Sequence, residues 1–289
     1  MFRPSPVSLQ VFDHGLQKQL LDKPELGSVR TVRHFSLARY TTGNTLGLLC
    51  EFVSDQEASC LAELTADLKN PKPAFVVKEI QKFARDKANR EVVAAITSLE
   101  LKNEEDKVHY LPVVGRICAV TLPSGGISVI PAVSIWDGQK LHDCCQTIDT
   151  QKKIENTFEL NQNLNSLEEL GLGVQMEVFL VDGNSWSKRS QYTAQTKNLS
   201  FAIVAAMFIS TESKVILFRL ESQGQQTKSL DVSKLQVKEM LTIDEAFGKS
   251  DTSDVNAYQD REMLQSADGL LFHNAKTGLL FELKFSKLG

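Results

Sequence analysis

Two uninterrupted apolar runs most constrain the fold of this chain, LSFAIVAAMFIS at residues 199–210 and KVILFRLES at residues 214–222. A strand with one solvated face alternates apolar and polar residues, so continuous apolar character predicts strands that are buried on both faces. The longest such run falls well short of the roughly 20 residues that a membrane-spanning helix needs. We therefore expect these runs to form a buried hairpin inside a sheet.

Other segments alternate polar and apolar residues and are bounded by turn signals. The stretch at residues 30–40 and the run at residues 46–52 flank Thr42-Gly43-Asn44, which predicts a hairpin. Residues 90–103 predict another strand, and the runs VVGRICAVTL and ISVIPAVSIW, separated by Pro-Ser-Gly-Gly, predict a second hairpin. Strands therefore dominate the sequence-based prediction.

Capping signals and helical spacing add a few predicted helices. Ser54 and Glu57 form a capping box before a helix predicted at residues 55–68. A second helix is predicted at residues 74–89, and others are predicted near residues 166–171, 242–248 and 253–265. The predicted fold class is α+β, with two strand-rich lobes of mainly antiparallel sheet and a few helices.

A polar stretch divides the chain into these lobes. Residues 138–166 are rich in Gln, Asn, Asp and Thr, as in a connector. The predicted domains are an N-terminal α+β lobe at residues 1–137 that contains a basic helix, the connector at 138–166, and a C-terminal α+β lobe at 167–289. A length of 289 residues with 42% hydrophobic residues suits one large core or two lobes.

The composition and the terminal residues indicate the expected cellular location and the cofactors to be expected. The N-terminal residues lack the pattern of a signal peptide, so the expected location is the cytoplasm, away from membranes. The five cysteines are scattered and imply no disulfide framework, and the adjacent pair Cys144-Cys145 lacks the usual spacing of zinc ligands. No cofactor is expected, except Mg²⁺ under the nuclease hypothesis below.

Charge is distributed unevenly along the chain, which has a net charge of −4. Residues 1–90 hold 13 Lys and Arg against 10 Asp and Glu, and residues 91–289 hold 19 against 26. The basic excess concentrates at residues 69–90, and it predicts a surface that attracts phosphates or an acidic partner protein. The predicted binding residues of this segment are Lys69, Lys72, Lys78, Lys82, Arg85, Lys87 and Arg90, and Arg30, Arg33 and Arg39 on the neighbouring hairpin extend the surface.

The last hairpin carries a second candidate site. In the strand GLLFELKF, Glu282 and Lys284 share one face because successive side chains alternate, and Asp268 opens the preceding strand. This order resembles the core of the PD-(D/E)xK, or restriction-endonuclease-like, nucleases. The resemblance implies that Asp268 and Glu282 bind Mg²⁺, that Lys284 helps to activate water, and that Glu262 is the acid of the preceding helix. The same alternation is also typical of an ordinary solvent-facing strand.

These patterns support three functions. The preferred one is a non-catalytic protein, part of a larger assembly, that binds nucleic acid or another polyanion, or an acidic partner protein, through residues 69–90. The alternative is a Mg²⁺-dependent nuclease that uses Asp268, Glu282 and Lys284. A third is a scaffold that self-associates through the apolar hairpin at residues 199–220, which would make the protein a homo-oligomer.

Overall fold

A computed structural model defines the fold, and several segments of the chain are not described. The described residues are 11–12, 19–21, 29–41, 45–54, 59–70, 75–83, 91–102, 108–121, 127–145, 158–159, 173–182, 188–189, 201–209, 214–222, 232–244, 261–274 and 278–285.

Antiparallel strands form four main sheets in chain order. The first sheet is β3-β4-β5-β6, formed by Val29–Thr41, Thr45–Ser54, Ser59–Asp67 and Val76–Phe83. The second sheet contains β7 (Glu91–Lys102), β8 (Val108–Thr121), β9 (Ile127–Trp136) and β10 (Leu141–Asp143), and β11 (Phe158–Glu159) also pairs with β9. Each strand from β3 to β10 follows its neighbour as a meander, apart from the break between the two sheets.

The third and fourth sheets continue the same organisation. The third has the order β13-β12-β14-β15-β16, formed by Lys188–Arg189, Val174–Asp182, Phe201–Ile209, Lys214–Ser222 and Leu235–Asp244. The fourth is β17-β18-β19, formed by Arg261–Gln265, Gly269–Asn274 and Leu279–Lys284. The strands β1 (Val11–Phe12) and β2 (Gln19–Leu21) form a separate two-stranded sheet.

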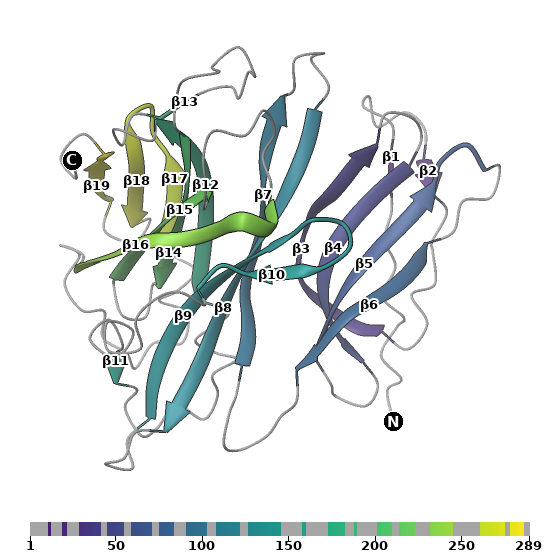
Figure 1. Ribbon diagram of the computed structural model, residues 1–289, viewed down its shortest axis with the longest axis horizontal. Coiled ribbons are helices and arrows are strands. Elements are labelled where there is room, and N and C mark those ends of the chain that lie inside the picture. Colours follow the sequence, from purple (N-terminus) through teal and green to yellow (C-terminus); the bar gives the residue numbers. More distant parts are fainter. Residues whose placement is uncertain are drawn as a thin grey trace.

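The sheets stack in sequence order through their first strands. Strand β3 packs against β7 and β8, β7 packs against β12, and β12 packs against β17. Figure 1 shows the first sheet at one end of the molecule and the fourth at the other, with the second and third sheets between them. Short antiparallel meanders that follow one another in this way are the building plan of β-propeller blades.

The apolar hairpin lies at the centre of the third sheet, as its sequence predicts. Side chains of β14 alternate between two apolar clusters. Ile203 and Met207 pack toward the second sheet, and Val204 and Phe208 pack toward the fourth sheet. The eight residues Ala202–Ile209 are all buried. Because both faces of the strand are covered by the chain itself, the prediction of a strand buried on both faces is confirmed.

A third apolar cluster joins the first and second sheets. It contains Leu49, Leu61, Val93, Val114 and Trp136, and Trp136 is only 1% exposed. The hydroxyl of Ser98 also donates a hydrogen bond to the backbone oxygen of Leu37 across this interface. These contacts set the position of β6 relative to the β9–β10 turn, which is the region of the candidate site.

The predicted fold class is wrong in its helical part, because the protein is an all-β structure. The helix predicted at residues 55–68 is largely β5, the basic helix predicted at 74–89 contains β6, and the end of the one predicted at 253–265 is β17. The helix predicted at 242–248 begins inside β16, and the one at 166–171 lies outside the described residues. A 3-10 turn forms at Val232–Lys234.

The tertiary structure explains these errors. Short apolar segments satisfy helical and strand spacing equally well, and here each one finds a neighbouring strand to complete its hydrogen bonds. In the part of the chain that the structure covers, no helix has the length and apolar character needed to cross a membrane.

The division into lobes at residues 1–137 and 167–289 stays a prediction. The second and third sheets, which lie in different predicted lobes, share one apolar cluster that includes Val113, Val133, Ile203 and Phe218. Much of the predicted connector lies outside the described residues.

Candidate functional site

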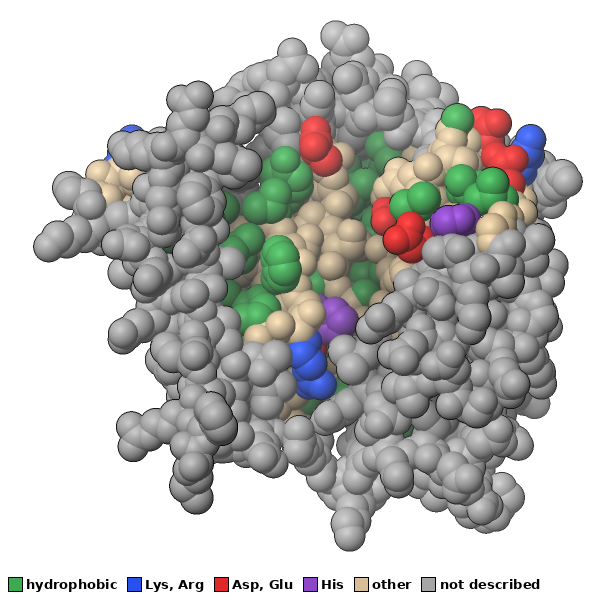
Figure 2. Space-filling view, turned by 180° about the vertical axis from the view of Figure 1, so that it is seen from behind, with side chains coloured by type: hydrophobic (Ala, Val, Ile, Leu, Met, Phe, Trp, Pro, Cys, Tyr) green, Lys and Arg blue, Asp and Glu red, His purple; other side chains and the backbone are tan. Residues whose placement is uncertain are grey.

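The carboxylates and lysine of the C-terminal hairpin lie on an exposed sheet surface. Glu282 and Lys284 are exposed while Leu283 between them is buried, and Lys284 Nζ lies 3.5 Å from Glu282 Oε2. Asp268 is exposed in the bend before β18, where its backbone oxygen accepts a hydrogen bond from the N–H of Phe285. Figure 2 shows acidic, basic and apolar side chains mixed at the upper right, the side that holds the C-terminal strands.

The resemblance to PD-(D/E)xK nucleases is therefore wrong. The hairpin belongs to a three-stranded antiparallel sheet, and Glu262, expected on a helix, is exposed on strand β17. Among the described residues, no group of three or more His, Cys, Asp and Glu is placed to hold a metal ion. The catalytic roles of Asp268, Glu282 and Lys284 depended on that resemblance, so we do not propose them.

The predicted basic surface is also different in the structure. Lys78 and Lys82 lie on β6, where they stand opposite Glu63 and Cys60 of β5. Because Glu63 and Cys60 are an odd number of residues apart on a regular strand, Lys78 and Lys82 point to opposite faces of the sheet. The helical face that would have joined them does not exist, and the prediction of nucleic-acid binding through it is not supported.

The remaining predicted basic residues divide into three groups. Lys69 is exposed in the turn after β5. Lys72, Arg85, Lys87 and Arg90 lie outside the described residues, as do the side chains of Arg30 and Arg39. Arg33 is held inside the first sheet.

A bulge in β3 directs Arg33 toward the buried carboxylate of Glu51. The β3–β4 register shifts between Val32 and His34, so Arg33 is an extra residue that lets two successive side chains approach Glu51. Arg33 Nη2 donates to Glu51 Oε1 at 2.7 Å, and Glu51 has no exposed side-chain surface. The hydroxyl of Ser59 donates to the same oxygen. Arg33 is therefore part of a buried ion pair.

His34 makes this cluster sensitive to acid. Burial lowers the pKa of His34 to about 4 and the nearby Arg33 charge adds to the effect, whereas an unfolded His has a pKa of about 6.5. The unfolded state therefore binds the proton more readily below pH 6.5. We expect the free energy of unfolding to fall by up to about 3 kcal/mol as pH drops from 6.5 to 4, with the Glu51 carboxylate 3.8 Å away reducing this loss.

Urea unfolding of the wild type and of His34→Gln at pH 7.5, 5.5 and 4.5 measures this effect. The variant should lose a large part of the pH dependence below pH 6.5, whatever its stability at pH 7.5. Equal pH slopes in the two proteins would show that His34 does not titrate in this range.

The outer edge of the first sheet exposes a short apolar and basic run. Strand β6 ends the sheet, and Val76 and Val77 are 66% and 43% exposed. Lys78 and Glu79 are exposed as well, so four consecutive residues face solvent. Edge strands present unpaired backbone groups, and natural proteins usually keep exposed apolar side chains away from them. We call residues 76–79 the open segment.

Strand β16 differs from this arrangement. Strand β16 also ends its sheet, yet Leu235 and Val237 are buried, and Lys238 is exposed beside them. Phe35 and Leu264, which are large exposed apolar residues on other strands, have no exposed apolar residue next to them in the sequence. Two adjacent exposed valines on a sheet edge therefore distinguish the open segment among the described residues.

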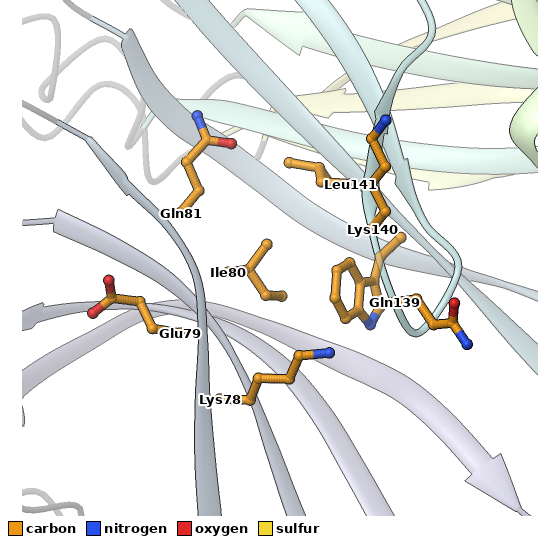
Figure 3. Close-up of a pocket in the computed structure, with 8 residues that line it drawn as sticks. Lys78, Glu79, Ile80, Gln81, Gln139, Lys140 and Leu141 are labelled. Carbon is orange, nitrogen blue, oxygen red and sulfur yellow. The ribbon is translucent and has the colours of Figure 1, made fainter.

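A pocket of about 270 Å³ adjoins the open segment. It lies between residues 78–81 of β6 and residues 136 and 139–141 of the β9–β10 turn. Figure 3 shows Lys78 and Ile80 extending toward that turn, while Glu79 extends from the other side of β6. Ile80 lies on the same side of β6 as Lys78, and it is a bulge residue because the register shifts between Gln81 and Glu79, so the residues after it change side.

The indole ring of Trp136 lines the pocket, and the buried residue Glu63 fixes its orientation. Trp136 Nε1 donates to Glu63 Oε1 at 3.4 Å, and Glu63 is 6% exposed. The ammonium of Lys78 lies 5.1 Å from the centre of the Trp136 ring, within the range of a cation–π interaction. Lys78 is thus placed at the pocket entrance with its charge still exposed.

The β9–β10 turn supplies a second lysine. Gly138 has a φ of 93°, which the turn requires, and Asp137 Oδ1 accepts hydrogen bonds from the backbone N–H groups of Gln139 and Lys140, both at 2.7 Å. Burial alone would raise the pKa of Asp137, but its hydrogen bonds with His142 and with these N–H groups lower it. The rigid turn therefore holds Lys140 beside the pocket.

Reasoning from the sequence missed four of these residues: Val76, Val77, Trp136 and Lys140. The signals were present in FVVKEIQKF, which is rich in β-branched residues, and in the turn sequence Trp-Asp-Gly-Gln-Lys. Because residues 74–89 were interpreted as a helix, the exposed strand edge at Val76 and Val77 was not predicted. Only the packing of two sheets brings Trp136 and Lys140 next to β6.

The described side chains at this site suit binding better than covalent chemistry. The pocket has no cysteine or histidine in its lining, and its exposed lysines are Lys78 and Lys140, whereas the side chain of Glu79 extends to the other side of β6. Elsewhere, burial raises the pKa of the Cys50, Cys60, Cys118 and Cys144 thiols to about 12, which leaves them as unreactive thiols at neutral pH.

Comparisons with known proteins add little. No protein-family model matches the chain, and no curated protein matches it. Among solved structures, the WD40 domain of SCAP from fission yeast aligns with 10% sequence identity over 95% of this chain and 68% of that chain, at a TM-score of 0.27. The fold is therefore defined by its sheet topology.

Proposed function

We propose that this protein is a non-catalytic interaction scaffold that binds a partner protein through the open segment of β6. The observation that carries the proposal is the pair of exposed valines, Val76 and Val77, on an edge strand with no neighbour among the described residues. Exposed sheet edges bind extended chains through main-chain hydrogen bonds, and the adjoining side chains add specificity. The all-β scaffold holds this edge in place through its interface with the second sheet.

Self-association through the apolar hairpin does not follow from the structure. Residues 203–208 of β14 and residues 215–218 of β15 have no exposed surface. A surface already covered by the chain's own second and fourth sheets is not available to another copy. The open segment is the better candidate surface.

Site-specific photo-crosslinking tests the proposal. A photoreactive phenylalanine analogue replaces Val76 in the full chain, and in a control it replaces Lys238 on the edge strand β16. After irradiation in extract of the source cells, we expect a discrete adduct with a different protein from position 76, and at least about tenfold less of it from position 238. Adding Val77→Asp to the first variant should reduce that adduct, since a buried carboxylate opposes apolar contact.

Two results would contradict the proposal. Equal adducts from positions 76 and 238 would show that β6 has no special role. An adduct from position 76 that contains only a second copy of this chain would identify self-association instead.

A further inference from the structure

The two faces of β6 present different side chains to a strand that would pair with it. Val76 and Lys78 point to the pocket side, where Lys78 stands opposite Glu63. Val77 and Glu79 point to the other side, where Val77 stands opposite Leu64. A strand added at the free edge also alternates its side chains between these two sides. Its sequence therefore has to match a valine and a lysine on the pocket side, and on the other side a valine and a glutamate that is already paired with Lys82.

The charges next to β6 favour an acidic strand on the pocket side. Lys78 and Lys140 are both exposed and both line the pocket. The nearby acids are occupied in other ways, because Glu63 lies beneath Trp136 and Glu79 is 3.5 Å from Lys82 on the opposite side of the sheet. Opposite charges on neighbouring strands stabilise their pairing, and like charges oppose it.

We infer that β6 binds an extended acidic segment of a partner protein as a fifth strand of the first sheet, with carboxylates toward Lys78 and Lys140 and apolar side chains toward Val77. This inference rests on the proposed function and specifies its partner chemistry. The backbone of the segment pairs with the outer N–H and C=O groups of β6, as in other cases of strand addition. The pocket receives the side chain that lies next to Lys78.

A capped ten-residue peptide of alternating Glu and Val is a suitable probe, because one face carries only carboxylates and the other only isopropyl groups. Binding to the full chain is measured by fluorescence anisotropy at low and physiological salt. Amide hydrogen exchange on the same complex should slow within Val76–Phe83, the extent of β6.

Matched variants isolate each part of the inference. Lys78→Glu/Lys140→Glu should weaken binding by at least about tenfold, whereas Lys238→Glu on the edge strand β16 should leave it unchanged. A peptide of alternating Lys and Val should not bind. The Glu-Val peptide with N-methyl groups on alternate residues keeps every charge but cannot form the strand ladder, and it should also fail to bind.

The results separate this inference from the proposed function. If the N-methylated peptide binds as well as the parent peptide, or if Lys238→Glu weakens binding as much as the double variant, the attraction is one of charge alone and strand addition is wrong. If no peptide binds while position 76 still forms its partner adduct, the scaffold function stands and the acidic strand is wrong.

Discussion

Replacing Arg33 by methionine is expected to lower the free energy of unfolding by about 3–5 kcal/mol, the usual cost of removing one partner from a buried ion pair. Glu51 has no exposed side-chain surface, and Arg33 Nη2 lies 2.7 Å from its carboxylate. Methionine keeps most of the apolar stem of arginine but removes the cation. Guanidinium chloride unfolding, followed by circular dichroism, measures the change.

A double variant controls for simple loss of packing. Arg33→Met combined with Glu51→Met removes both charges, so it should recover a large part of the stability that Arg33→Met loses. If Arg33→Met leaves stability unchanged, Arg33 is a surface residue of the kind that the basic-surface hypothesis required, and the buried ion pair is wrong.

Replacing Phe272 by alanine is expected to cost about 3–5 kcal/mol, the typical loss for truncating a buried phenylalanine. Phe272 has no exposed surface, and its ring lies 5.1 Å from that of Phe208 in an edge-to-face arrangement. A second aromatic pair, Phe179 with Phe285 at 5.4 Å, joins the same two sheets. These contacts attach the fourth sheet to the third. In Phe272→Ala, the strands of the fourth sheet should therefore open before the other sheets do.

Hydrogen exchange by mass spectrometry checks this expectation. In Phe272→Ala, protection should fall in β17, β18 and β19 before it falls in the first sheet. Leu280→Ala is the matched control, because it also truncates an apolar residue of this sheet but at a side chain that is 65% exposed. It should change stability by less than about 0.5 kcal/mol. Equal losses in the two variants would mean that Phe272 does not hold the fourth sheet in place.

The C-terminal hairpin shows how far a local pattern can be trusted. Alternation correctly placed Glu282 and Lys284 on one exposed face and Leu283 on the other. It could not show whether the neighbouring elements were helices or strands. The nuclease resemblance needed that wider context, and strand β17 with its exposed Glu262 removes it.

The basic segment shows the opposite failure, in which the local structure itself was misassigned. Lys78 and Lys82 share a face at helical spacing, but the strand and its bulge at Ile80 send them to opposite sides of the sheet. A bulge depends on the register with β5, and register depends on which strands meet. Charge counts along the chain therefore overestimated a continuous basic surface, and they missed the exposed valines.

Local sequence patterns were enough to predict the buried hairpin of β14 and β15, the strands β3, β4, β7, β8 and β9, and the outward face of the last strand. In each of these segments the apolar spacing specifies which side chains must leave water. The three-dimensional structure was needed to show that residues 59–67 and 76–83 are strands, that Arg33 is buried against Glu51, and that Trp136 and Lys140 lie beside β6. These features arise from pairing and packing between segments far apart in the chain, where the partner that completes each hydrogen bond is absent from the local sequence.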